Sequence, residues 1–187
     1  MTASKKDNTF GFATKAIHAG AHPEYVTGAR NTPIFQTTSY VFDNTKQAES
    51  LFKLQDFGFV YSRLTNPTVS VLEERLSSLE KSRAAVACSS GHAAQQLAFA
   101  ALISNGDHFI ASNKLYGGSI NQFKKTFNNF GWDCTLVDPE NVNNFENAIR
   151  KNTKLIFIET LSNPDGSILD VEPISKISKK YHIPLIV

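Results

Sequence analysis

The sequence predicts an α/β protein whose main domain has three layers, with a mostly parallel sheet between two layers of helices. Apolar strand-like segments and amphipathic helix-like segments alternate five times after residue 65. Strands that are joined through helices run parallel, with right-handed crossovers. Two strand segments, 84–88 and 155–158, are almost wholly apolar, which is typical of strands that are covered on both faces.

Residues 1–60 differ in pattern from the rest of the chain. Short apolar clusters are separated by loop residues, and only the stretch 45–54 has a helical pattern. A long, sparsely structured but apolar segment is unusual inside a compact domain. We therefore expect residues 1–60 to be an N-terminal arm that contacts a neighbouring subunit.

The regular pattern begins at Thr65-Asn66-Pro67, where a capping residue stands just ahead of a proline, as at many helix starts. Apolar residues then follow at three- and four-residue spacing, and these are Val69, Leu72, Leu76 and Leu79. The strand 84–88 comes next. The same criteria predict further helices over 92–104, 119–130, 142–149 and 171–177, and further strands at 108–111, 134–137, 155–158 and 183–187.

The last expected strand, 183–187, has no helix after it to cover it. A bare apolar strand at a chain end is an aggregation hazard. We therefore interpret the sequence as truncated, so that residues 61–187 form an incomplete α/β domain whose C-terminal part is missing.

Composition argues against several functional classes. The net charge is +2, acidic and basic residues are interspersed, and no basic block predicts a nucleic-acid partner. Residues 1–8 are polar and lack the apolar core of a secretory signal, and no apolar stretch approaches membrane-spanning length. The two cysteines, Cys88 and Cys134, lack metal-ligand spacing and are expected to be buried free thiols. A reducing cytoplasm fits this cysteine usage.

The segment 84–95 is the most informative single stretch, although its signal is weak when it is taken alone. A strand-like stretch stops at Ser89-Ser90-Gly91, and an Ala-rich helical stretch follows. The first N–H groups of a helix have no intrahelical partner, and the helix dipole favours negative charge there, so a phosphate could bind. On these residues alone, an ordinary turn that merely requires serine and glycine is an alternative.

Polar residues also follow other strand ends. Tyr116, Glu159 and Asn163 come just after predicted strands, as Ser90 and Gly91 do. Ligands of parallel sheets bind beyond the carboxyl ends of the strands. These residues could therefore converge on one cleft.

Five segments together resemble a known family, and they are 33–40, 61–68, 89–94, 116–118 and 159–164. In order and spacing they are similar to the pyridoxal-phosphate-dependent enzymes of cysteine and methionine metabolism, over about residues 15–187. The resemblance implies pyridoxal 5′-phosphate (PLP) as cofactor. It also implies a PLP-dependent transferase-like domain of fold type I, with residues 61–187 as an incomplete PLP-binding part.

The resemblance implies two sets of donors for the cofactor phosphate. Arg63 would bind it bidentately and Tyr61 would add a hydroxyl, both reaching into the neighbouring subunit's site. The backbone N–H groups of Gly91 and His92 would bind the same phosphate at the helix start, where Gly91 leaves room for a close approach. The family more often has methionine where His92 stands, a change that a backbone contact tolerates. For the His92 side chain we expect a capping or packing role, and we expect no metal site because no second histidine lies at ligand spacing.

By the same resemblance, Tyr116 stacks on the pyridine ring, and its hydroxyl could move a proton near the substrate. Tyr116 is thus the candidate catalytic residue, and Tyr61 and Tyr116 are the candidate substrate-binding residues. Asn163 would hydrogen-bond the ring oxygen, although Asn-Pro is also an ordinary turn sequence. Glu159 could support that turn and is given no catalytic role.

The methionine-degrading lyases tend to carry cysteine where Gly118 stands, which argues against that activity. The histidines at 18, 22, 108 and 182 are expected to be surface or packing residues.

Central parts of the family's site are absent from this sequence. The aspartate that pairs with the ring nitrogen, the Schiff-base lysine and the arginine that holds the substrate carboxylate would all lie beyond residue 187. No lysine in the sequence occupies the matching position. The fragment by itself is therefore expected to hold parts of the cofactor and to be inactive.

For the intact protein, the resemblance implies γ-replacement on O-acetylhomoserine with sulfide or a thiol, giving homocysteine or methionine plus acetate in methionine biosynthesis. The amino-acid sequences of segments 59–63 and 90–95 look most like those of the sulfhydrylase branch of the family. Alternatives are cystathionine γ-synthase, O-succinylhomoserine sulfhydrylase and methionine γ-lyase of the same family, or a non-catalytic truncated fragment. The family also implies a homotetramer of close dimers with sites shared between subunits. A dinucleotide-binding dehydrogenase is disfavoured, because no G-x-G-x-x-G opens the first helix.

Overall fold

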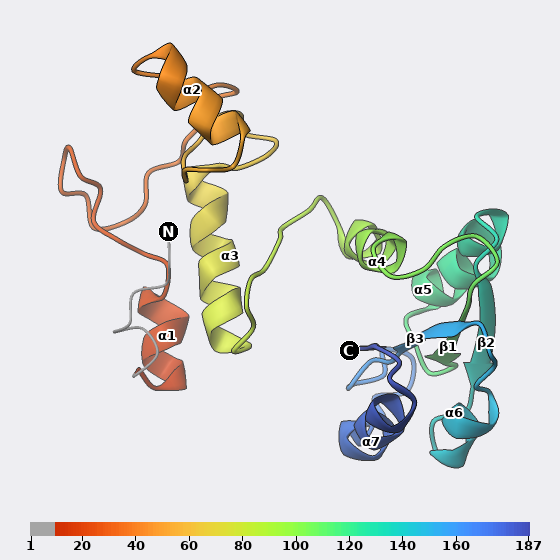
Figure 1. Cartoon of the computed structure of the whole chain (residues 1–187). Helices are drawn as coiled ribbons and strands as arrows, with labels where there is room; N and C mark the ends of the chain where they lie inside the picture. The colour runs from red at the N-terminus through yellow and green to blue at the C-terminus, as the bar shows by residue number, and fades with distance from the viewer. Residues whose placement is uncertain (1–9) are drawn as a thin grey trace. The chain divides into compact units, whose positions relative to one another are not determined.

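The computed structural model describes residues 10–187, and the chain divides into two compact units between Ala87 and Cys88 (Figure 1). The expectation that residues 1–8 are not a secretory signal lies outside the described residues. The described part of the expected arm, residues 10–60, lies in the first unit. The same unit contains Tyr61, Arg63 and the helix that follows them.

The first unit is helical, with α1 (Phe12–His18), α2 (Thr45–Phe52) and α3 (Pro67–Leu79). The expected helices α2 and α3 are confirmed, and each begins after a capping asparagine. Asn44 accepts a hydrogen bond from the Gln47 N–H, and Asn66 accepts one from the Thr68 N–H. Pro67 stands in the first turn of α3, where its missing N–H costs nothing.

The prediction that only 45–54 would be helical within residues 1–60 is wrong, because α1 is a second helix there. None of its residues is buried, so no apolar periodicity marks it in the sequence. Instead, α1 packs against α3 just before Gly20. Gly20 has φ +72°, and a Cβ there would lie 2.8 Å from the Glu74 Cβ, so only glycine allows this close approach.

The second unit contains the sheet. Its four strands are all parallel in the order β2-β1-β3-β4, and they are β1 (His108–Ser112), β2 (Asp133–Val137), β3 (Thr153–Phe157) and β4 (Leu185–Ile186). The helices are α4 (Gly91–Ala100), α5 (Gly117–Asn121), α6 (Asn143–Asn147) and α7 (Val171–Tyr181). The helix expected over 119–130 is α5 running directly into a π-helix, η2 (Gln122–Phe127). The parallel α/β prediction is therefore confirmed.

Side chains of β1 belong alternately to two separate hydrophobic cores, one on each face of the sheet. Helices lie on both faces (Figure 1). On one face Phe109 packs edge-on against Phe99 of α4, with 4.8 Å between ring centroids, and η2 adds Phe123. On the other face Ile110 packs with side chains of α6 and α7, which are Phe145, Ile174 and Ile177. These two cores confirm the three-layer architecture.

The predicted strand at 84–88 is wrong. This segment makes no strand pairing within residues 10–187, and the Ala87 N–H donates to the Glu73 carboxylate instead, at 2.8 Å. Val86 is 82% exposed. A strand exists only when a neighbour satisfies its backbone groups, and an apolar pattern does not supply that neighbour.

The prediction for the cysteines is partly wrong. Both thiols are free, but Cys88 is exposed because it lies in the unpaired segment. Cys134 lies on β2 and is partly buried, and this burial raises its pKa to about 12.

Within residues 10–187, no helix has the length and apolar character that crossing a membrane requires.

Candidate active site

The first turn of α4 presents backbone N–H groups to solvent. Ser90 caps this helix, because its Oγ accepts from the Ala93 N–H at 3.1 Å and its carbonyl accepts from the Ala94 N–H at 2.9 Å. The N–H groups of Gly91 and His92 find no acceptor among residues 10–187, and both residues are exposed. A Cβ at Gly91 would meet no atom within 4 Å. The turn therefore offers two donors and open space, which suits an anion.

Tyr116 is held in place at the start of α5. Its backbone N–H donates to both carboxylate oxygens of Glu159, at 3.3 and 3.2 Å. Glu159 lies two residues after the end of β3, and Tyr116 lies four residues after the end of β1. The end of β3 therefore holds the turn that follows β1. Sequence reasoning missed this contact, because nothing in the sequence pairs residues that are 43 positions apart. The Tyr116 side chain is half-exposed, so its ring is available to a ligand.

The rings of His92 and Tyr116 lie 5.7 Å apart with 30° between their planes. Gly118 lies against both rings. A Cβ at position 118 would lie 2.4 Å from Tyr116 Cε1 and 2.7 Å from His92 Cε1. The His92 side chain therefore packs on Tyr116, in agreement with the packing role expected for it, and the glycine makes room for the pair.

Asn163 lies in the turn after β3. The strand-like residues Leu161 and Ile168 form an isolated antiparallel bridge around this turn, and Asn163 is exposed at its tip. Hydrogen bonds from the Ser167 hydroxyl and amide hold the pKa of the Asp165 carboxyl well below its usual range. Lys114 lies 3.2 Å from the same carboxylate, which anchors the turn to the end of β1.

A cavity of about 280 Å³ opens at the carboxyl ends of the strands. Its lining includes Ser112, Lys114 and Glu159, but not Gly91, Tyr116 or Asn163. The sheet edge expected for ligand binding thus carries a hollow. Glu159 links that hollow to Tyr116 through the hydrogen bonds described above.

Tyr61 and Arg63 lie in the first unit, on a segment that pairs with the arm. Ser39 and Tyr61 form an antiparallel bridge, and the Ser62 N–H donates to the Thr38 carbonyl at 2.8 Å. The Arg63 guanidinium carbon lies 5.5 Å from the centre of the Tyr61 ring. Both side chains are exposed, and Arg63 makes no ion pair with any residue of 10–187. An exposed guanidinium without a carboxylate partner is suited to binding an anionic group.

Asn66 is a supporting residue of this segment whose full role the sequence did not reveal. Besides capping α3, its Nδ2 donates to the Phe35 carbonyl at 2.9 Å and to the Ser62 Oγ at 3.0 Å. Only the Asn-Pro helix start was visible in the sequence. The additional bonds fix the chain around Ser62, directly between Tyr61 and Arg63.

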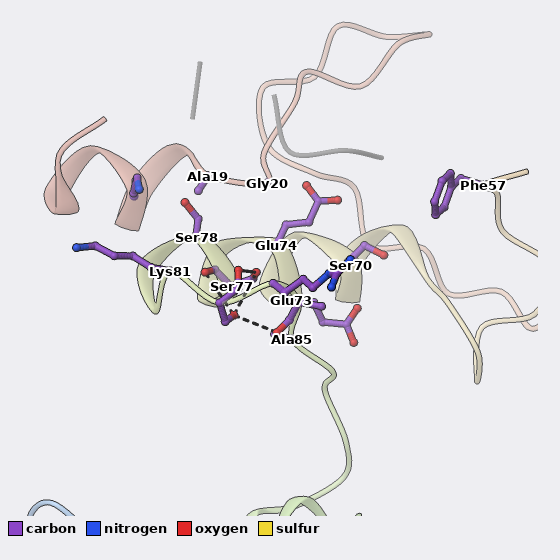
Figure 2. A pocket seen from close by; sticks show the side chains of 14 residues that line it. Ala19, Gly20, Phe57, Ser70, Glu73, Glu74, Ser77, Ser78, Lys81 and Ala85 are labelled. Carbon is purple, nitrogen blue, oxygen red and sulfur yellow. Dashed lines mark hydrogen bonds between the residues drawn. The ribbon is translucent and has the colours of Figure 1, made fainter. Parts of the chain in front are cut away.

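A cavity in the first unit holds none of the predicted site residues. It has a volume of about 660 Å³ and lies against α1, α3 and the segment after α3 (Figure 2). Its charged lining mixes Glu73 and Glu74 with Lys81, and no single charge dominates. Over residues 10–187, no three His, Cys, Asp or Glu side chains gather in a way that could hold a metal ion.

Comparison with known proteins gives consistent results. The sequence profile of the family described as "Cys/Met metabolism PLP-dependent enzyme" matches residues 13–187. An O-acetyl-L-homoserine sulfhydrylase of Corynebacterium glutamicum is 43% identical over 98% of this chain and 43% of its own length. A homocysteine/cysteine synthase of Saccharomyces cerevisiae is 43% identical over 94% of this chain and 40% of its own length.

The fold also matches a solved structure. A Campylobacter jejuni protein described as an O-acetylhomoserine (thiol)-lyase, with N′-pyridoxyl-lysine-5′-monophosphate, is 39% identical and has a TM-score of 0.90. The match covers 94% of this chain and 43% of that one. The chain therefore spans less than half the length of the relatives that it matches.

Proposed function

The chain belongs to the Cys/Met metabolism PLP-dependent enzyme family, and from this premise we propose that it is part of a longer enzyme acting on O-acetylhomoserine. The proposed reaction replaces the γ-acetoxy group, which leaves as acetate, with sulfide or a thiol, giving homocysteine or methionine. The observation that carries this proposal is the 43% identity, over 98% of the chain, to an O-acetyl-L-homoserine sulfhydrylase.

The residues present fit PLP. Within residues 10–187, the N–H groups of Gly91 and His92 have no acceptor and the Arg63 guanidinium makes no ion pair, so these are donors of the kind that a phosphate requires. We assign these three residues and the Tyr61 hydroxyl to the phosphate. Bound PLP supplies an electron sink for negative charge that develops on the amino-acid substrate.

The other assigned residues would orient the cofactor and move a proton. The ring of Tyr116 is half-exposed, and we assign it to stacking on the cofactor and its hydroxyl to proton transfer near the substrate side chain. Glu159 fixes the Tyr116 backbone, so that the ring starts from a defined position. The exposed amide of Asn163 is assigned to the cofactor's ring oxygen.

A homo-oligomer with shared sites is part of the proposal. In this arrangement Tyr61 and Arg63 reach into the neighbouring subunit's site, and the arm covers that subunit's surface. Several large apolar side chains of the first unit are almost fully exposed in the single chain, which supports such a contact, and these are Tyr25, Val41, Leu54 and Phe57. We further propose a cytoplasmic location, which the free thiols of Cys88 and Cys134 support.

The reaction is tested by incubating the full-length protein with O-acetylhomoserine and sulfide. The proposal expects homocysteine and acetate in equal amounts. Release of ammonia and a 2-oxo acid from methionine, without homocysteine formation, would move the assignment to a lyase. Inactivity with all of these substrates, together with a stop codon directly after Val187, would indicate a non-catalytic fragment.

A further inference from the structure

Two glutamine side chains tie the first turns of α4 to the helix that starts after Tyr116. Gln122, the first residue of η2, donates through Nε2 to the His92 carbonyl at 3.1 Å. Gln95 of α4 donates through Nε2 to the Oγ of Ser119 in α5 at 2.9 Å, and Ser119 is only 1% exposed. The two bonds run in opposite directions between the same pair of helical segments.

Aromatic packing continues this contact away from the site. Phe123, which follows Gln122, lies 5.2 Å ring to ring from Phe99 at the far end of α4. Ser119, Gln122 and Phe123 therefore all contact α4. The aromatic pair already supplies apolar packing, so the glutamines are not needed for that purpose.

Both glutamines carry an energetic cost. The Oε1 atoms of Gln95 and Gln122 are buried and have no hydrogen-bond partner among residues 10–187. A buried acceptor without a partner loses its hydration and gains nothing in return, a cost that leucine or methionine would avoid. For Gln122 the orientation of the amide is unambiguous, since a backbone carbonyl can only accept. What the side chains contribute is the N–H bonds that they donate.

We propose that Gln122 and Gln95 are positioning residues for the cofactor site. They hold the first turn of α4, with the N–H groups of Gly91 and His92, at a fixed place relative to Tyr116 at the start of α5. This inference rests on the proposed function, in which those N–H groups bind the PLP phosphate and the Tyr116 ring stacks on the cofactor. Neither glutamine touches the cofactor in this account.

If the glutamines position the phosphate donors, their loss should weaken the binding of PLP and not the binding of pyridoxal, which lacks the phosphate. The two dissociation constants can be measured separately. In the full-length apoprotein, Gln122→Leu should raise the dissociation constant of PLP about three- to tenfold, the loss expected for one neutral hydrogen bond. Binding of pyridoxal, which lacks the phosphate, should be nearly unchanged. Gln96 is exposed on the same helix, so Gln96→Leu is the matched control and should leave both constants unchanged.

The outcomes distinguish this proposal from the proposed function. If the wild-type protein binds no PLP, the proposed function fails. If the wild type binds PLP and Gln122→Leu binds it equally well, or loses PLP and pyridoxal affinity in the same proportion, only the positioning role is overturned. Should Gln122→Leu not fold, as judged by circular dichroism, Gln95→Leu decides the same comparison. Selective loss of PLP affinity would support the proposal, and an unchanged ratio would refute it.

Discussion

At position 118 the lack of a side chain allows two rings to lie together. A Cβ there would overlap Tyr116 Cε1 at 2.4 Å and His92 Cε1 at 2.7 Å, so one ring or both would have to move. Gly117, its neighbour, differs completely, because a Cβ at 117 would meet nothing within 4 Å. The two adjacent glycines therefore form a matched pair for a substitution test.

We predict that Gly118→Ala weakens cofactor binding and that Gly117→Ala does not. Overpacking of this kind costs about 1–3 kcal/mol, so the PLP dissociation constant of Gly118→Ala should rise about five- to 150-fold if the cost falls on the cofactor-bound state. The measurement is an absorbance titration of the full-length apoprotein with PLP. Equal affinities in the two variants would show that the ring pair plays no part in binding.

His108 is a fully buried histidine at the start of β1. Its Nδ1 and Nε2 each lie 2.8 Å from a threonine hydroxyl, those of Thr153 on β3 and Thr135 on β2. Arg150 donates to both of these hydroxyl oxygens as well. Burial, and then the nearby Arg150 charge, lower the pKa of His108, because both disfavour the imidazolium form.

This histidine should make the protein less stable in acid. Since the folded protein keeps His108 neutral, the unfolded chain binds one more proton once the pH falls below the ordinary imidazole pKa of 6.5. The contribution is fully present above pH 6.5 and is lost as the pH falls from 6.5 toward the lowered pKa of the folded state. Urea unfolding midpoints at pH 7.5, 6.5 and 5.5 should therefore decline.

The control for this effect is a pair of substitutions. His108→Gln should lower the midpoint at pH 7.5 but flatten its decline toward pH 5.5, whereas His22→Gln, at an exposed position, should keep the wild-type decline. If the wild type and His108→Gln declined in parallel, the titration of His108 would not be the cause.

At the scale of the element, Asn66 shows how one side chain can both start a helix and fasten it. Its Oδ1 caps α3, and its Nδ2 donates to the Phe35 carbonyl and the Ser62 hydroxyl. Asn44 caps α2 in the same manner but is exposed, and its side-chain amide nitrogen donates to nothing within residues 10–187. An aspartate at either position could still accept the capping bond, but it could not donate.

We predict that Asn66→Asp lowers the free energy of unfolding by about 1–3 kcal/mol, the cost of leaving a partly buried acceptor unpaired. Asn44→Asp should change it by less than about 0.5 kcal/mol, because a carboxylate remains a good cap. Both values come from urea unfolding of the full-length protein at neutral pH. Similar values for the two variants would mean that only capping matters at Asn66.

The elements also show what the sequence could and could not predict. Helices and strands with an apolar period, such as α3, α7 and β3, lie close to where the spacing put them, because their pattern reflects the core that they face. The exposed helix α1 has no such pattern. The segment 84–88 has a strand-like composition but no partner among residues 10–187, and pairing is a property of two segments rather than one.

For the site, the resemblance identified Tyr61, Arg63, Gly91, His92, Tyr116 and Asn163 as candidates. The structure brings His92 and Tyr116 together and leaves the Gly91 and His92 N–H groups unpaired within residues 10–187. The supporting contacts, from Glu159 to Tyr116 and from Gln122 to His92, could not be read from the sequence. They join residues 43 and 30 positions apart, and only the fold decides such pairs.

At the scale of the whole molecule, the chain covers 43% of a relative that is an O-acetyl-L-homoserine sulfhydrylase. Its two units carry different parts of the proposed phosphate site, with the cationic Arg63 in the first and the N–H groups of Gly91 and His92 in the second. We propose that two different subunits contribute these parts to one site. Such a site has a distinct signature when subunits are mixed.

That signature is measured by complementation between two variants of the full-length enzyme, Arg63→Ala and Tyr116→Ala, produced separately and co-expressed. Each alone should be almost inactive in forming homocysteine. In a dimer that contains one subunit of each variant, one of the two sites has both native residues. Such mixed dimers make up half of a random population. Activity should therefore return to about one quarter of the wild-type value. A co-expressed mixture no more active than the separate variants would contradict the shared site.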